Sequence, residues 1–216
     1  MKNEIKAIAE SIIGRKLTIE DGISISKIKD IENKLECKIP TELKDFYNLI
    51  GNLDMFMSSF EDFPEPYLIG NKIVFLEENQ GVCYWGINKD DSESPTVYVC
   101  TDIESENLEW YSESVNLAEF LKIIMYFQCA QGGCKHGGAI YDCNFKSKDE
   151  YVGVLNKLVH DWQKVVEHNG LVIFQNRGKL VWYFTDEQGS IGDTIFASTY
   201  SELGMKELEI YGFKEL

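Results

Sequence analysis

The chain has 216 residues, of which 44% are hydrophobic and 26% charged, and its formal net charge is −15. This composition is typical of a folded globular protein and excludes a disordered acidic tail. A net charge of this sign repels phosphate, and no basic patch with interleaved aromatic residues is visible, so we exclude direct nucleic-acid binding.

The first thirteen residues form an amphipathic pattern with interleaved charges. They lack the apolar core and the cleavage site of a signal peptide, and no later stretch approaches the length of a membrane span. We therefore expect a cytoplasmic protein that makes no membrane contact.

Two helices are expected in the first fifty residues. The first follows Ser24, and its apolar residues recur at helical spacing at Ile25, Ile28, Ile31 and Leu35. The second follows Pro40 and carries Leu43, Phe46, Tyr47 and Ile50 on one side. Pro40 suits the first turn of this helix, and Gly51 is placed to take the left-handed conformation at its end.

Short runs of β-branched and aromatic residues follow from Tyr67. They predict an antiparallel meander of about four strands, at residues 73–76, 82–87, 97–100 and 108–111. A helix comes next, with Asn116 as its cap, Glu119 completing a capping box, and a glycine-rich loop after Cys129 at its end.

The last third continues with helix and strand signals. Ser147 and Glu150 form another capping box, and an apolar stripe from Tyr151 to Val166 predicts one helix that Gly170 stops. Residues 171–174 and 180–184 read as a hairpin, and residues 194–197 as another strand. Because no linker or repeat separates the thirds, we expect a single α+β domain over residues 1–216, with residues 147–216 packed on it as a helix and hairpin extension.

Six cysteines include one group that could bind a metal. Cys129, Cys134, His136 and Cys143 offer three thiols and an imidazole, which is a possible tetrahedral zinc set. Their irregular spacing and the lack of a CxxC pair argue against it, so we predict no metal and no cofactor, and the glycines around His136 predict a flexible loop. Cys83 and Cys100 lie in strand-like runs and are expected in the core.

The case for an enzyme is weak. The chain contains three histidines and none of the GxSxG, Walker, HExxH or GxGxxG motifs. His160 and Asp161 are adjacent on the predicted helix and would point to different sides, so they would not form an orienting pair. We predict no catalytic residues.

A family resemblance is carried by the middle of the chain. Ile39-Pro40, Leu43 and Phe46-Tyr47 are followed by Phe75-Leu76-Glu77-Glu78-Asn79-Gln80-Gly81-Val82 and Trp85-Gly86-Ile87, and then by Asp90-Asp91, Pro95, Trp110 and the helix from Leu117. This order resembles the SMI1/KNR4 family, also called the SUKH superfamily, over residues 23–125. The resemblance implies a largely antiparallel or mixed central sheet with helices packed around it. It also implies a binding protein, since bacterial members are mostly immunity proteins that neutralise toxin domains, often nucleases, and fungal members regulate cell-wall synthesis.

The charge distribution agrees with a binding role. Residues 45–121 contain 16 acidic residues and only two basic ones, Lys72 and Lys89, so they hold 14 of the 15 excess negative charges. A nuclease presents lysine and arginine to phosphate, and an acidic surface would attract and cover it. The open alternatives are a solvated acidic face without a partner, and a regulatory or scaffolding module that binds an endogenous protein.

Contacts with such a partner are expected in two loops and one polar run. The first loop, residues 60–67, combines acids with aromatic residues, and the second is the acidic stretch after Ile87. The polar run contains Glu77-Glu78, which either caps the meander or lines a groove. For the first loop, the alternative is a lid folded onto the core. The predicted contact residues are Glu61, Asp62, Phe63, Glu65, Tyr67, Glu77, Glu78, Asp90, Asp91 and Glu93. The sequence makes no prediction of oligomeric state.

Overall fold

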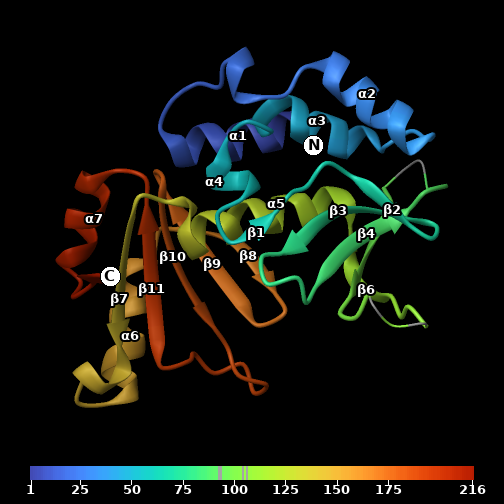
Figure 1. Ribbon diagram of the computed structural model, residues 1–216. Coiled ribbons are helices and arrows are strands. Elements are labelled where there is room, and N and C mark those ends of the chain that lie inside the picture. Colours follow the sequence, from blue (N-terminus) through green and yellow to red (C-terminus); the bar gives the residue numbers. More distant parts are fainter. Residues whose placement is uncertain (92–93, 104, 106) are drawn as a thin grey trace. The chain divides into compact units, whose positions relative to one another are not determined.

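The computed structural model describes residues 1–91, 94–103, 105 and 107–216. The chain forms two compact units, the first made of Met1–Ala9 and Lys16–Gln128 and the second of Glu10–Arg15 and Cys129–Leu216. Each unit combines helices with an antiparallel sheet, which confirms the α+β class (Figure 1). We describe each unit by itself, and a single domain over residues 1–216 stays a prediction.

Two helices of the first unit begin at residues that the sequence marks as their starts. Ser24 Oγ accepts a hydrogen bond from the Lys27 N–H at 3.2 Å, and Pro40 occupies the N-cap of the next helix. Both predicted helices are therefore confirmed. The helical elements are α1 (Lys2–Ile13, which enters both units), η1 (Ile19–Asp21), α2 (Ile25–Leu35), α3 (Thr41–Ile50), α4 (Asp54–Met57) and α5 (Leu117–Gln128).

Gly51 corrects one expectation. Its φ of −63° is right-handed, so the left-handed end predicted for α3 is wrong. Glycine is needed there for space, because a Cβ at this position would lie 2.5 Å from the Tyr47 carbonyl oxygen. The same reason is stronger at Gly22, where a Cβ would lie 1.7 Å from the Asn48 carbonyl oxygen.

The predicted meander forms the sheet of the first unit. Its strands are β1 (Glu61–Asp62), β2 (Tyr67–Ile69), β3 (Lys72–Glu78), β4 (Tyr84–Asn88), β5 (Thr96–Cys100) and β6 (Tyr111–Asn116). The order is β1-β3-β4-β5-β6, all antiparallel, and β2 also pairs with β3. The last strand begins later than predicted because β6 is a largely exposed edge strand with polar side chains, which gives no apolar signal.

Helix α5 packs its apolar residues against this sheet. Asn116 Oδ1 accepts a hydrogen bond from the Glu119 N–H at 3.0 Å, which confirms the predicted cap. The Phe120 ring lies 6.0 Å from Phe75 on β3 and 6.3 Å from Trp85 on β4. Helix α3 packs against α5 in turn. Strands β3 and β4 are thereby packed against α5 on one side.

The second unit contains a sheet of order β12-β7-β11-β10-β9-β8, again all antiparallel. Its elements are η2 (Cys129–Gly133), β7 (His136–Tyr141), η3 (Asp142–Asn144), α6 (Lys148–Leu158), β8 (Gln163–His168), β9 (Leu171–Asn176), β10 (Lys179–Phe184), β11 (Thr194–Thr199), α7 (Glu202–Glu209) and β12 (Lys214–Glu215). The predicted hairpin is confirmed, with Arg177 and Gly178 in its turn at φ 48° and 76°. Helices α6 and α7 bury their apolar residues on one face of this sheet.

The helix predicted from Ser147 to Gly170 is wrong in its second half. Helix α6 ends at Leu158, and β8 follows as a strand that pairs with β9. Asn169 and Gly170 have positive φ and form the tight turn between these strands, so Gly170 closes a hairpin instead of stopping a helix. The apolar stripe gave a wrong prediction because the β-branched residues Val165 and Val166 fit both the helical and the strand periodicity over so short a segment.

The flexible loop predicted around His136 is also wrong. Cys129–Gly133 forms a π-helical turn, and His136 to Gly138 belong to β7, which is held by β11 on one side and β12 on the other. Gly138 serves packing, because a Cβ there would lie 2.2 Å from Met205 Cε.

Candidate functional site

Two neighbouring strands of the first unit place four carboxylates opposite one another. In the antiparallel register of β1 and β3, Glu61 faces Glu78 and Asp62 faces Glu77. We call these four residues the acidic ladder. Side chains at directly opposed positions share a face of the sheet at Cβ separations of about 5 Å, and like charges so placed are destabilising. Because successive side chains alternate between faces, Glu61 and Glu78 lie on one face and Asp62 and Glu77 on the other. Packing alone does not explain this arrangement.

Glu61 is the buried member of the ladder. Only 4% of its surface is exposed, and its backbone N–H donates to Gln128 Oε1 at 3.0 Å. The carboxyl accepts a hydrogen bond from the Asn79 backbone, whereas Oε2 has no partner among the described residues. Burial, and then the charge of Glu78, raises the pKa of Glu61 to about 7.

Gln128 holds the strand that carries Glu61 and Asp62. This fully buried side chain accepts from the N–H groups of Phe60 and Glu61 and donates to the Glu61 carbonyl oxygen. The sequence indicated Gln128 only as part of a helix stripe. An amide alone on an apolar stripe is the signal that could have identified it, since a buried amide requires partners.

The other three ladder residues remain accessible. Asp62 is exposed, and Glu77 and Glu78 are half-buried. The Tyr67 hydroxyl donates to Glu77, and burial together with this bond raises the pKa of Tyr67. Glu78 Oε2 accepts from the Val82 N–H at 3.2 Å. Within the described part of the chain, no lysine or arginine forms an ion pair with any of these three carboxylates.

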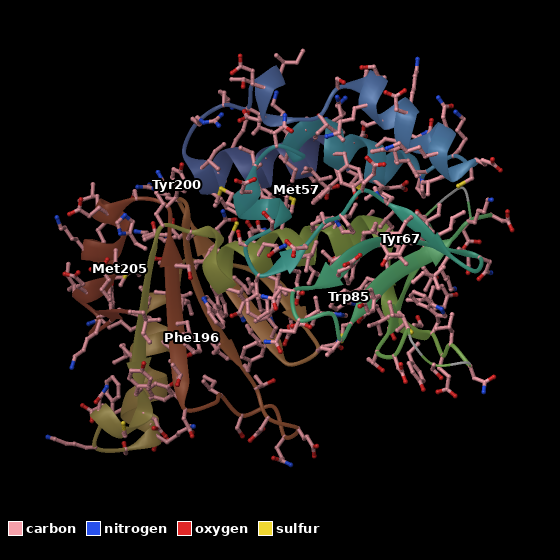
Figure 2. All side chains as sticks on the ribbon, in the orientation of Figure 1. Met57, Tyr67, Trp85, Phe196, Tyr200 and Met205 are labelled. Atoms are coloured by element: carbon pink, nitrogen blue, oxygen red, sulfur yellow. The ribbon has the colours of Figure 1, made fainter. Side chains whose placement is uncertain are left out.

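A fifth carboxylate and an indole extend the ladder across the sheet. Trp85 Nε1 donates to Glu113 Oε1 on β6 at 2.7 Å, and Trp85 is half-buried. Figure 2 shows Trp85 and Tyr67 on the strands of this sheet. The pKa of Cys83 is raised by burial and then by the charges of Glu78, Glu61 and Glu113, so these three carboxylates lie close to the β3–β4 turn. Sequence reasoning missed Glu113, because an isolated acid on a polar edge strand carries no signal.

The remaining predicted contacts of the first loop do not join the ladder. Phe63 packs on Phe46 at 4.9 Å and on Phe75 at 6.3 Å, which agrees with the alternative of a lid folded onto the core. Glu65 is exposed but forms an ion pair with Lys34 at 2.5 Å.

The second predicted group lies among lysines. Asp90 and Asp91 line a depression of about 490 Å³ together with Lys38, Lys44 and Lys89. Asp91 also accepts from Asn88 Nδ2 at 2.9 Å. This region has mixed charge, unlike the acidic ladder, and Glu93 lies outside the described residues.

Lys72 is one of the two bases of the acidic segment, and it is turned inward. Its Nζ lies 3.5 Å from the centre of the Tyr98 ring and 5.9 Å from that of Trp110, and it donates to Asn88 Oδ1 at 2.5 Å. Burial lowers its pKa. The ammonium is committed to internal contacts, so it does not neutralise the ladder.

Comparisons with models of protein families, with curated proteins and with solved structures found no match. The resemblance to the SMI1/KNR4 family therefore stays a prediction. In the described residues, no group of three or more His, Cys, Asp or Glu side chains has an arrangement that could hold a metal ion. No helix in that part of the chain is both long and apolar enough to cross a membrane.

His160 and Asp161 correct a further expectation. They lie in the turn after α6, where the backbone is no longer helical, and His160 Nδ1 is hydrogen-bonded to Asp161 Oδ1 at 2.8 Å. Both side chains are at least 80% exposed, so the pair sits on open surface and not in a cleft. The absence of catalysis stays a prediction.

Proposed function

We propose that this chain is a non-catalytic binding protein that captures a basic protein partner through the acidic ladder, and that it acts as an immunity protein against a toxin domain of the nuclease type. The observation that carries this proposal is the pair of accessible carboxylates at Asp62 and Glu77, which oppose each other on one face of the sheet and for which the described residues supply no basic counter-ion. Such a pair repels itself in the free protein, and a lysine or arginine from a partner relieves that repulsion.

The resemblance to the SMI1/KNR4 family supports the same class of function. Its residues include Glu77 and Glu78, which are also ladder residues. A nuclease surface arranged to bind phosphate is complementary in sign, and attraction between the two surfaces speeds their encounter. A regulatory module that binds an endogenous protein remains the alternative.

The test is co-expression of the chain with toxin domains encoded in the same genome, scored by cell survival. We expect rescue from one toxin, and a loss of rescue for the double variant Asp62→Asn, Glu77→Gln. The matched control is Glu187→Gln, Glu209→Gln, which removes two exposed acids of the second unit and should retain rescue. Absence of rescue from every toxin, with capture of a constitutive host protein instead, would favour the regulatory alternative.

The salt dependence of binding tests separately whether electrostatic attraction guides the partner to the acidic ladder. Charges on exposed surfaces are screened over about 8 to 10 Å at ordinary ionic strength, so the association rate constant should fall as salt rises. An association rate that is independent of salt would reject steering by the acidic ladder.

A further inference from the structure

A pocket of about 420 Å³ lies in the second unit, on its own sheet and its π-helical turn. Val181 and Tyr183 point into the core under α6 and α7, so the alternating Trp182 and Phe184 lie on the other face of the sheet. Trp182 and Phe196 form the floor, stacked at 4.2 Å between ring centres (Phe196 is labelled in Figure 2). The pocket volume falls in the range of small-molecule sites.

Two thiols line this pocket. Cys129 is completely buried and Cys134 is partly exposed. The two residues bracket the π-helical turn, in which the Cys134 N–H donates to the Cys129 carbonyl oxygen at 3.3 Å. Burial, and then a hydrogen bond with the Cys134 side chain, keeps the pKa of Cys129 well above its usual range.

We propose that Cys129 and Cys134 are an oxidisable pair, which hydrogen peroxide entering the pocket converts into an intramolecular disulfide. The hydrogen bond between the Cys134 N–H and the Cys129 carbonyl oxygen, together with the pocket that both residues line, makes the two cysteines close neighbours, as a disulfide requires. Two of the four residues between the cysteines are Gly132 and Gly133, so the turn can adjust as the sulfurs approach bonding distance.

The chemistry balances with the peroxide as the only oxidant. The Cys134 sulfur attacks one peroxide oxygen, the O–O bond breaks, and the other oxygen leaves as water after taking up a proton, which gives a sulfenic acid. The Cys129 sulfur then attacks the sulfenic sulfur, and the hydroxyl leaves as a second water with the Cys129 proton. Two thiols lose two electrons, and one peroxide is reduced to two waters.

The order of attack follows from exposure. Cys134 forms part of the accessible wall, whereas Cys129 has no exposed surface, so the oxidant meets Cys134 first and Cys129 resolves it. Cys143 is more exposed than either, and it lies in the 3-10 turn after β7, away from the π-helical turn. It therefore serves as an internal reference for a thiol that oxidises without bridging.

The experiment uses the whole reduced chain, treated with hydrogen peroxide, quenched, alkylated under denaturing conditions and digested with trypsin. Lys122 and Lys135 place both cysteines in one peptide, residues 123–135. We expect this peptide to be lighter by two hydrogen atoms and to resist alkylation until a dithiol reductant is added. In the same samples, the Cys143 peptide should be alkylated or oxidised to higher acids, without a bridge.

Two variants assign the roles. Cys134→Ser should leave Cys129 alkylatable after the same peroxide treatment, because the first target is gone. Cys143→Ser should bridge residues 129 and 134 as the unmodified chain does. The proposal is overturned if the unmodified chain gives sulfinic acid at Cys134 with Cys129 still alkylatable, or if a bridge joins any other pair of cysteines.

Discussion

Replacing Glu61 by glutamine should stabilise the protein at neutral and alkaline pH and should have no effect in acid. Glu61 is only 4% exposed, and the pKa of its carboxyl is raised to about 7 from the ordinary value of 4.5. Below pH 4.5 both the folded and the unfolded chain hold the proton, so this group contributes nothing to the pH dependence. Between pH 4.5 and 7 the unfolded chain ionises first, and above pH 7 the folded chain carries the full cost of a buried charge.

The size of the effect follows from the shift. A difference of 2.5 between the two pKa values corresponds to about 3 kcal/mol of lost stability above pH 7. Glutamine has nearly the same shape, remains neutral, and still accepts the hydrogen bond from the Asn79 backbone. We therefore expect Glu61→Gln to raise the free energy of unfolding by about 3 kcal/mol at pH 8 and by nearly nothing at pH 4.

The assay is urea denaturation followed by tryptophan fluorescence at pH 4, 6 and 8. Glu187→Gln is the control, because Glu187 is an exposed acid of the second unit, so its effect should stay within about 0.5 kcal/mol at every pH. Glu78→Gln should recover part of the gain, since the charge of Glu78 is the second cause of the shift. A Glu61→Gln protein with unchanged stability from pH 4 to pH 8 would refute the reasoning.

Three further predictions test the contacts that position the site. Gln128→Met removes the partners of two N–H groups and one carbonyl oxygen, so thermal or urea unfolding should show a loss of about 3 to 6 kcal/mol. Gly22→Ala places a Cβ 1.7 Å from a backbone oxygen and should lower the free energy of unfolding by more than about 2 kcal/mol. Gly153→Ala, on the open surface of α6, should raise it by about 0.5 to 1 kcal/mol. Equal effects of the two substitutions would contradict the steric account. Lys72→Met combined with Tyr98→Leu in a double-mutant cycle should give a coupling of about 1 to 2 kcal/mol, and a coupling near zero would show that the cation–π contact is not formed.

Much of the fold could be predicted from local signals. Helices α2, α3 and α5 were located because Ser24, Pro40 and Asn116 mark their starts and their apolar residues keep one period. The meander and the β9–β10 hairpin followed from alternation and turn residues. These signals act within a few residues, so they do not depend on the rest of the chain.

The errors arose where distant contacts decide the structure. Residues 163–168 carry an apolar stripe that suits a helix, but pairing with β9 makes them a strand. The glycines at 137 and 138 suggested a loop, but pairing with β11 and β12 makes them part of a sheet. Long-range pairing overrides local propensity in both segments, and a single sequence does not reveal it.

The candidate site, like the fold, was only partly predictable from the sequence. The excess of acid in residues 45–121 was visible from composition, but the sequence could not show which acids retain unpaired charge. Lys34 neutralises Glu65, Asp90 and Asp91 share a depression with three lysines, and burial shifts Glu61 toward its neutral form. Only the register of β1 against β3 reveals the ladder, because Asp62 and Glu77 are 15 positions apart in the chain.

The ladder is maintained against its own electrostatic cost by contacts outside it. Gln128 fixes β1 with three hydrogen bonds, and the Tyr67 hydroxyl supports Glu77. If the ladder had only a structural role, replacing its accessible acids by amides would relieve repulsion and increase stability with no other effect. If it binds a basic partner, the same replacements should increase the stability of the free chain and weaken the complex. This opposite response of Asp62→Asn, Glu77→Gln in the two measurements is the expected signature of a site kept for binding.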